Sequence, residues 1–136
     1  EPYQVAADWE PVYEMKEAVS IPVLGNGGIT SMADGLAKQQ NLDGFLIAQA
    51  TFGNPWIFSR SDSPISFSEK ISVIEDHARW LIDHKGPSVG CREIRKHLLK
   101  YFKQYPHAKT FRKQCSTVES FDQIRSILQK ANECVD

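Results

Sequence analysis

The sequence has 136 residues, of which 41% are hydrophobic and 24% charged, and its formal net charge is −1. These values are ordinary for a globular protein and allow one domain or two small ones. No run reaches the roughly 18 apolar residues of a membrane-spanning helix, and no basic segment followed by an apolar one marks a secretion leader. Membrane proteins and secreted disulfide scaffolds are therefore not expected.

The cysteines and histidines carry no recognisable ligand pattern. Cys91, Cys115 and Cys134 are widely spaced and form neither a C-x-x-C pair nor a disulfide framework. We expect them to be reduced thiols in a cytoplasmic protein. The four histidines are scattered, so we expect no bound metal.

Helices and short apolar runs alternate in the first part of the chain. A helix is predicted from Asp8 to about Val19, and a second from Ser31 to about Gln40, with Asn41 as its left-handed stop. The two apolar runs, Ile21–Leu24 and Gly44–Ala48, are predicted to be buried strands. A third helix is predicted to begin at Pro55. Connections of a few residues then imply parallel strands with right-handed crossovers.

The composition changes after Phe58. Residues 61–67 lie in a Ser/Pro-rich stretch that reads as a linker, and everything from residue 68 onward has helical periodicity. The predicted helices cover residues 68–84, 90–104, 107–115 and 120–134. Gly86–Pro87 and Pro106 mark breaks between them.

A glycine-rich turn follows the first predicted strand. Gly25, Asn26, Gly27 and Gly28 stand between that strand and the helix starting near Ser31. Glycine lets the backbone approach an anion closely, and the N–H groups at a helix start favour phosphate. The turn Ala48–Gln49–Ala50 follows the next strand, and paired turns after the last two strands are the usual phosphate site of a (β/α)8 barrel.

Residues 7–58 and residues 95–112 form two sequence blocks that resemble the tRNA-dihydrouridine synthase family. Residues 7–58, with IPVLGNGGI and later DGFLIAQATFGNPWIF, are similar to the last barrel segments of that family. The run RKHLLKY at residues 95–101, followed by Pro106, Ala108 and Arg112, is similar to a run in its C-terminal helical domain. The resemblance covers nearly the whole chain, and the two blocks occur in the family's order.

The resemblance implies an α/β fold: terminal β/α units of a (β/α)8 TIM barrel in residues 1–60, the linker 61–67, and an all-α helical bundle that binds tRNA in residues 68–136. It also implies an oxidoreductase, a flavoprotein that uses FMN, reduced by NADPH, to convert uridine to dihydrouridine in tRNA. The FMN phosphate would be held by the two turns, with cofactor-binding residues Asn26, Gly27, Gly28, Ala48 and Gln49.

The chain departs from the family pattern in two respects. The family usually has Gly-Arg where this chain has Ala48–Gln49, and a neutral amide binds phosphate more weakly than a guanidinium. The family's general acid is a cysteine in an N-x-G-C-P-type segment, which this sequence lacks, and none of its three cysteines matches that position. We therefore expect no catalytic residue here, a C-terminal portion that is inactive alone, and a need for a preceding barrel portion to stabilise the sheet.

The basic residues are concentrated in one block. Eight Lys or Arg residues lie between residues 92 and 113 against one acid, whereas residues 1–60 carry three basic residues and seven acids. On a helix, Ile94, Leu98, Tyr101 and Phe102 share one face and the basic residues the other. An uncompensated positive face favours a polyanion. The predicted RNA-binding residues are Arg92, Arg95, Lys96, His97, Lys100, Lys103, Lys109, Arg112 and Lys113.

Large aromatic residues are interpreted as core anchors, namely Trp9, Trp56, Phe58 and Trp80. Two alternative functions stay open from the sequence. One is a stand-alone RNA-binding helical module. The other is a different FMN-dependent barrel oxidoreductase, in which the basic helix is only a solvated surface.

Overall fold

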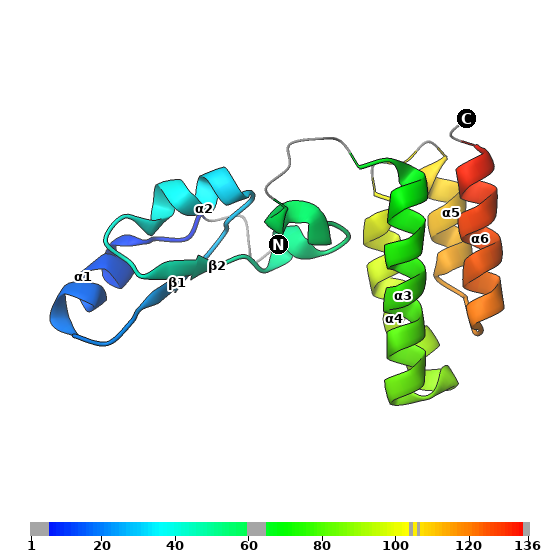
Figure 1. Cartoon of the computed structure of the whole chain (residues 1–136), viewed down its shortest axis with the longest axis horizontal. Coiled ribbons are helices and arrows are strands. Elements are labelled where there is room, and N and C mark those ends of the chain that lie inside the picture. Colours follow the sequence, from blue (N-terminus) through cyan, green and yellow to red (C-terminus); the bar gives the residue numbers. More distant parts are fainter. Residues whose placement is uncertain (1–5, 60–64, 104, 106, 135–136) are drawn as a thin grey trace. The chain divides into compact units, whose positions relative to one another are not determined.

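The structure of this chain is a computed structural model that describes residues 6–59, 65–103, 105 and 107–134 (Figure 1). The chain divides into two compact units, Glu1–Arg60 and Ser61–Asp136, each of which is described by itself. Within the described residues, no helix is long and apolar enough to cross a membrane. Of the predicted features, Pro106 and part of the linker lie outside the described residues.

The first unit alternates helices and strands as predicted. Its elements are α1 (Glu10–Ala18), β1 (Leu24–Asn26), α2 (Met32–Gln39), β2 (Gly44–Leu46) and the short 3-10 helices η1 (Gln49–Thr51) and η2 (Pro55–Phe58). β1 and β2 pair in parallel, with Leu24 opposite Gly44 and Asn26 opposite Leu46. The prediction of parallel strands is confirmed, while the helix expected at Pro55 is a single 3-10 turn.

The first strand begins three residues later than predicted. Ile21 is exposed, and the backbone N–H of Val23 donates to the side-chain oxygen Oδ2 of Asp43 at 2.7 Å. The same carboxylate forms an ion pair with Lys16 at 2.8 Å. Because a side chain takes the place of a ladder partner at Val23, regular pairing starts only at Leu24.

The core of the first unit is built around Trp9. Its indole packs over Gly25, where an added Cβ would overlap the ring, and its Nε1 donates to the carbonyl of Gly27 at 3.1 Å. Ile29, Leu42 and Ile47 are the other buried hydrophobic residues of this cluster. The position of the glycine turn after β1 is thereby tied to α1 and its flanking residue Trp9.

Of the two predicted ends of α2, the N-terminal cap is confirmed and the C-terminal stop is not. The hydroxyl of Ser31 accepts a hydrogen bond from the N–H of Asp34 at 3.0 Å, as predicted. The predicted stop at Asn41 is wrong by one residue, because the positive φ of 41° lies at Gln40. Asn41 instead donates its side-chain amide to the carbonyl of Tyr13 at 3.5 Å.

The regular elements described in the second unit are all helices. Its helices are α3 (Phe67–Lys85), α4 (Pro87–Tyr101), α5 (Ala108–Cys115) and α6 (Phe121–Glu133). The four predicted helices are confirmed with shifted ends. α4 starts three residues early because proline fits the first helical position, and Gly86, with φ 80°, separates it from α3.

The predicted linker 61–67 extends into the first helix of this unit. Ser66 is the N-cap of α3, and Glu69 bonds back to it in a reciprocal capping box. Phe67 is buried, and its ring centroid lies 3.9 Å from that of Tyr105. The helical unit therefore begins at Ser66, and these two residues are part of it.

Each helix of the second unit contributes buried apolar residues to one core. Ile74, Ile94, Phe111 and Leu128 represent α3, α4, α5 and α6 in a single buried cluster. The face predicted for α4 is confirmed, since Ile94, Leu98 and Phe102 are fully buried.

Two of the expected aromatic anchors lie outside a core. Trp9 is buried as predicted, but Phe58 and Trp80 are 57% and 56% exposed. The prediction was wrong for these two because residue type alone does not say which side of a helix a ring occupies.

Candidate phosphate-binding edge and basic helical surface

The glycine turn after β1 has the backbone that only glycine adopts readily. Gly27 has φ 150° and Gly28 has φ 60°. A Cβ added at Gly28 would meet no atom within 4 Å, so open space lies beside this part of the turn. The predicted use of glycine for an unusual backbone is confirmed at both positions.

The turns after β1 and β2 lie at the same edge of the sheet. The last pair in the parallel register is Asn26 opposite Leu46. Gly27 follows β1 directly, and Ala48 follows β2 after one intervening residue. Because parallel strands end on the same side, the segments 26–28 and 48–49 come next to each other. The two turns therefore leave the sheet at the same end of its strands.

The second turn is fixed by Thr51. Its N–H and its hydroxyl both donate to the carbonyl of Ala48, at 3.0 and 2.6 Å. This carbonyl is occupied within the turn, while Ala48 and Gln49 are both exposed. The two hydrogen bonds from Thr51 therefore close the turn, and Gln49 within it is exposed.

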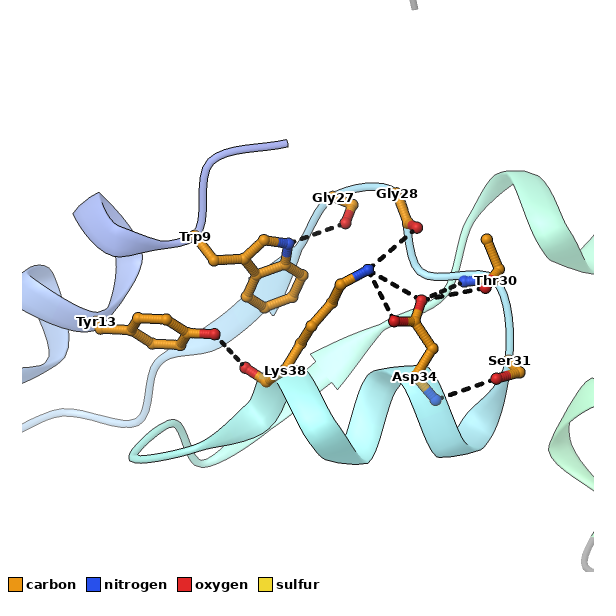
Figure 2. A network of polar contacts seen from close by, with 8 residues as sticks. All are labelled: Trp9, Tyr13, Gly27, Gly28, Thr30, Ser31, Asp34 and Lys38. Atoms are coloured by element: carbon orange, nitrogen blue, oxygen red, sulfur yellow. Dashed lines mark hydrogen bonds and ion pairs between the residues drawn. The ribbon is translucent and has the colours of Figure 1, made fainter. Parts of the chain in front are cut away.

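A polar network holds the segment between the glycine turn and α2 (Figure 2). Asp34 accepts hydrogen bonds from the N–H and hydroxyl of Thr30, at 2.8 and 3.2 Å. Lys38 pairs with Asp34 at 2.9 Å and donates to the carbonyl of Gly28 at 3.4 Å. The hydrogen bond from Lys38, together with that from Thr30, holds the pKa of the Asp34 carboxyl below its usual range.

Sequence reasoning did not assign Lys38 a role at this turn. The signal was present, because Asp34 and Lys38 are four residues apart and such pairs meet on a helix surface. What the sequence did not show is that the ammonium group also reaches back to the Gly28 carbonyl. Figure 2 shows Lys38 lying along α2 toward the glycine turn, so that the network restrains the turn from the helix side.

Most predicted RNA-binding residues lie on the exposed faces of α4 and α5. The exposed members are Arg92, Lys96, Lys100, Lys103, Lys109, Arg112 and Lys113. We call this set the basic surface. Tyr101 is half-buried at its border.

Arg95 and His97 are engaged within the helical unit. The Nε and Nη2 groups of Arg95 both donate to the carbonyl of Val118, at 3.0 and 2.8 Å. The His97 ring lies 4.6 Å from that of His77, centroid to centroid. Burial lowers the pKa of both imidazoles, and the mutual repulsion of the two rings lowers that of His97 further. Arg95 and His97 are thus held by contacts inside the helical unit.

The three cysteines lie in the helical unit and differ in burial. Cys91 and Cys115 are buried and Cys134 is exposed, and all three are free. Burial raises the pKa of Cys115 to about 12. In the part of the chain that the structure describes, no group of three His, Cys, Asp or Glu residues is placed to hold a metal ion.

Comparisons with known proteins agree with the two sequence blocks. The family model "Dihydrouridine synthase (Dus)" matches residues 1–135. A probable tRNA-dihydrouridine synthase of Mycobacterium tuberculosis is 32% identical over 145 residues, which include 98% of this chain and 37% of that protein. A tRNA-dihydrouridine synthase B of Pseudomonas aeruginosa is 33% identical over 139 residues, with 93% of this chain and 42% of that protein covered.

The similarity extends to a third bacterial group, with a probable tRNA-dihydrouridine synthase of Rickettsia conorii that is 31% identical over 121 residues, or 81% of this chain. The chain spans 37 to 42% of the length of these three relatives. The match of the family model from end to end, with the parallel strands and the helical unit in the expected order, identifies the chain as a member of the dihydrouridine synthase (Dus) family.

Proposed function

We propose that these residues serve in the FMN-dependent reduction of uridine to dihydrouridine in tRNA, with NADPH as reductant. The first unit would supply the closing β/α segments of a (β/α)8 barrel, and the second unit would bind tRNA, the substrate class that points to the cytoplasm. The observation that carries the proposal is the parallel pairing of β1 and β2, which brings the segments 26–28 and 48–49 to one sheet edge.

The residues at this edge fit a terminal phosphate. Asn26 and Gln49 are exposed donors, Gly28 borders open space, and a glycine is needed at Gly27 because side chains of the first unit occupy the space beside it. In the proposed site these four residues and Ala48 hold the FMN phosphate, and Lys38 keeps the carbonyl of Gly28 turned toward α2. FMN, when bound and reduced, supplies the hydride for the uracil ring.

No residue of this chain is proposed as the proton donor. Cys91 and Cys115 are buried in the helical unit, and Cys134 follows its last helix. We propose that the proton comes from a segment outside these residues. The chain's own part is to bind the cofactor phosphate and to position the tRNA.

Gln49 provides a test of the cofactor site. Replacing Gln49 by Arg adds a permanent charge and a fork of N–H donors, so FMN should bind about tenfold more tightly. The measurement is a flavin-fluorescence titration in a chimaera that joins the preceding barrel segments of the M. tuberculosis relative to this chain. The matched control is Gln39→Arg on α2, which adds the same charge away from the turn. Equal affinities for Gln49→Arg and the parent would remove Gln49 from the site.

The basic surface provides a test of RNA binding. The affinity of the chain for bulk tRNA should fall steeply with salt, because phosphate contacts release counterions. A double variant, Lys100→Ala with Lys103→Ala, should flatten the slope of log K against log salt by about 2. Lys130→Ala with Gln129→Ala on α6 is the control. A salt slope unchanged by the α4 variant would contradict the proposed surface.

A further inference from the structure

An exposed aromatic pair lies on α3, outside the basic surface and outside the core. The rings of Trp80 and His84 stack with centroids 4.4 Å apart and planes inclined by 28°. Nδ1 of His84 lies 2.8 Å from the carbonyl oxygen of Trp80, and since a carbonyl only accepts, Nδ1 carries the proton. The hydrogen bond and the stacking together hold the indole in one orientation, although more than half of its surface is exposed.

The pair lies beside His77, on the exposed flank of α3. At about 100° per residue, His77, Trp80 and His84 fall within an arc of about 60°. His77 contacts α4 directly, because its Nδ1 lies 3.2 Å from the hydroxyl of Tyr101 and its ring lies 4.6 Å from that of His97. The aromatic pair therefore lies along the seam between α3 and α4.

The neighbouring strip of α4 carries lysines. Glu93, His97 and Lys100 share one arc of that helix, and Lys96 lies beside it. The ion pair between Lys85 and Glu93, at 2.7 Å, fixes the same strip against the C-terminal end of α3. Lys96 and Lys100 are exposed, so two cations lie across the seam from the aromatic pair.

We infer that Trp80 and His84 form a stacking platform for an unpaired nucleobase of RNA, while Lys96 and Lys100 hold the adjoining phosphates. Every base has a π-face, and stacking on exposed aromatic side chains beside a cationic track is how proteins grip single-stranded nucleic acid. The inference rests on the proposed RNA binding and deepens it, because it names unpaired nucleotides as the class that this face takes.

The acidic residues of α3 determine which path the RNA backbone can take. Asp76 and Asp83 are exposed and lie one turn from Trp80 on either side. Their charge repels phosphate, so the RNA backbone must follow α4 and only the uncharged base reaches across to α3. It follows that Asp83→Asn should strengthen the binding of single-stranded RNA about two- to threefold by removing one repulsive charge.

The test uses the 136-residue chain and two fluorescein-labelled RNAs. One is a 12-nucleotide oligouridylate, and the other is a hairpin whose two strands are joined by a non-nucleotide linker, so that it contains no unpaired base. Trp80→Leu should weaken oligouridylate binding by about 5- to 100-fold, as expected for the loss of one stacked base. Trp80→Phe, which keeps a flat ring, should bind within about threefold of the parent. Hairpin binding should change less than twofold in either variant.

Three further measurements show whether weaker binding comes from lost stacking, from a lost charge contact or from misfolding. The salt slope should be the same for Trp80→Leu and the parent, because no phosphate contact is removed, whereas Lys100→Ala should flatten it by about 1. Oligouridylate should quench tryptophan emission in the parent and not in Trp80→Phe. Since Trp80 is exposed, the melting temperature of both variants should stay close to that of the parent.

The outcomes distinguish the platform from the proposed function. If the parent binds RNA with a steep salt slope and Trp80→Leu binds oligouridylate equally well, the platform is wrong and RNA binding stands. If Trp80→Phe and Trp80→Leu weaken oligouridylate binding equally, the indole is not a stacking surface. If the parent binds neither RNA at 50 mM salt, both proposals fail.

Discussion

Gly90 shows how one hydrogen atom in place of a side chain can decide helix packing. An added Cβ would lie 2.6 Å from Cα and 2.7 Å from N of Ile82 in α3, and backbone atoms cannot swing aside. Gly90→Ala would gain about 1 kcal/mol of intrinsic helix propensity. We nevertheless expect the free energy of unfolding to fall by about 1–3 kcal/mol, because α4 must move off α3.

Urea denaturation followed by circular dichroism measures this loss at Gly90. Ser126→Ala, on the exposed side of α6, is the matched control and should be neutral or slightly stabilising. A Gly90→Ala variant more stable than the parent would mean that the two helices have room to adjust.

Thiol chemistry should separate the three cysteines. Cys134 is exposed, whereas Cys91 and Cys115 are buried and burial raises the pKa of both thiols, that of Cys115 to about 12. Since the thiolate is the reactive form, one thiol should react quickly with Ellman's reagent at pH 8, and two only on the timescale of unfolding. Cys134→Ser should abolish the fast phase.

The same burial makes the helical unit sensitive to alkaline pH. An unfolded thiol ionises near its ordinary value of 9.0, and the buried Cys115 does so only near 12. The native state therefore loses stability between these two values and keeps it below pH 9. A Cys115→Ala variant should show a smaller decline in melting temperature over the accessible part of that range, from pH 9 to 10.5.

At the scale of the element, α4 combines a structural cation with exposed ones. Arg95 bonds twice to the Val118 carbonyl and so fixes the segment between α5 and α6, while Lys96 is exposed. We expect Arg95→Ala to lower the free energy of unfolding by about 1.5–3 kcal/mol, because hydrogen bonds from a charged group to a buried partner are lost. Lys96→Ala should leave stability within about 0.5 kcal/mol and weaken tRNA binding.

Thermal unfolding and tRNA titration, carried out on the same two proteins, separate these roles of α4. Arg95→Lys is informative as well, because an ammonium group cannot reproduce the fork of N–H donors. If Arg95→Ala proved as stable as Lys96→Ala, the contacts with Val118 would be incidental.

The sequence predicted those features that depend on residues close together in the chain, and it missed those that depend on distant residues or on side-chain conformation. The helical periodicity of α4 predicted its buried residues Ile94 and Leu98, because apolar spacing depends only on the chain itself. The start of β1 was missed because it depends on the carboxylate of Asp43, which is distant in sequence. The glycine turn was predictable from its glycines, while the reach of Lys38 to Gly28 depends on how its side chain lies along α2.

At the scale of the whole molecule, the two units differ in how much they bury. In its described residues, the first unit has a two-stranded sheet and leaves several large hydrophobic side chains exposed, including Ile21, Leu36 and Leu46. A two-stranded sheet is marginal by itself, and open edges invite further strands. The second unit closes its core with side chains from all four of its helices. This contrast is the physical reason to expect that the helical unit folds independently, whereas the first unit needs additional strands.

The boundary of the helical unit can be tested with two truncations. A protein starting at residue 68 lacks Phe67, whose ring packs against Phe102 and Tyr105, and also the Ser66 cap. A protein starting at residue 65 keeps both. We expect residues 65–136 to melt cooperatively as a helical protein, and residues 68–136 to melt at least 10 °C lower, because deletion of a buried Phe costs about 3–5 kcal/mol and a domain of this size loses about 4–8 °C per kcal/mol.

Phe67→Ala within residues 65–136 separates the two losses. It should reproduce most of the drop, whereas Ser66→Ala should account for the smaller remainder, since a lost N-cap costs about 1 kcal/mol. Equal melting temperatures for both truncations would show that the core closes without Phe67. A gradual, non-cooperative transition for residues 65–136 would show instead that the four helices do not fold independently and need the first unit.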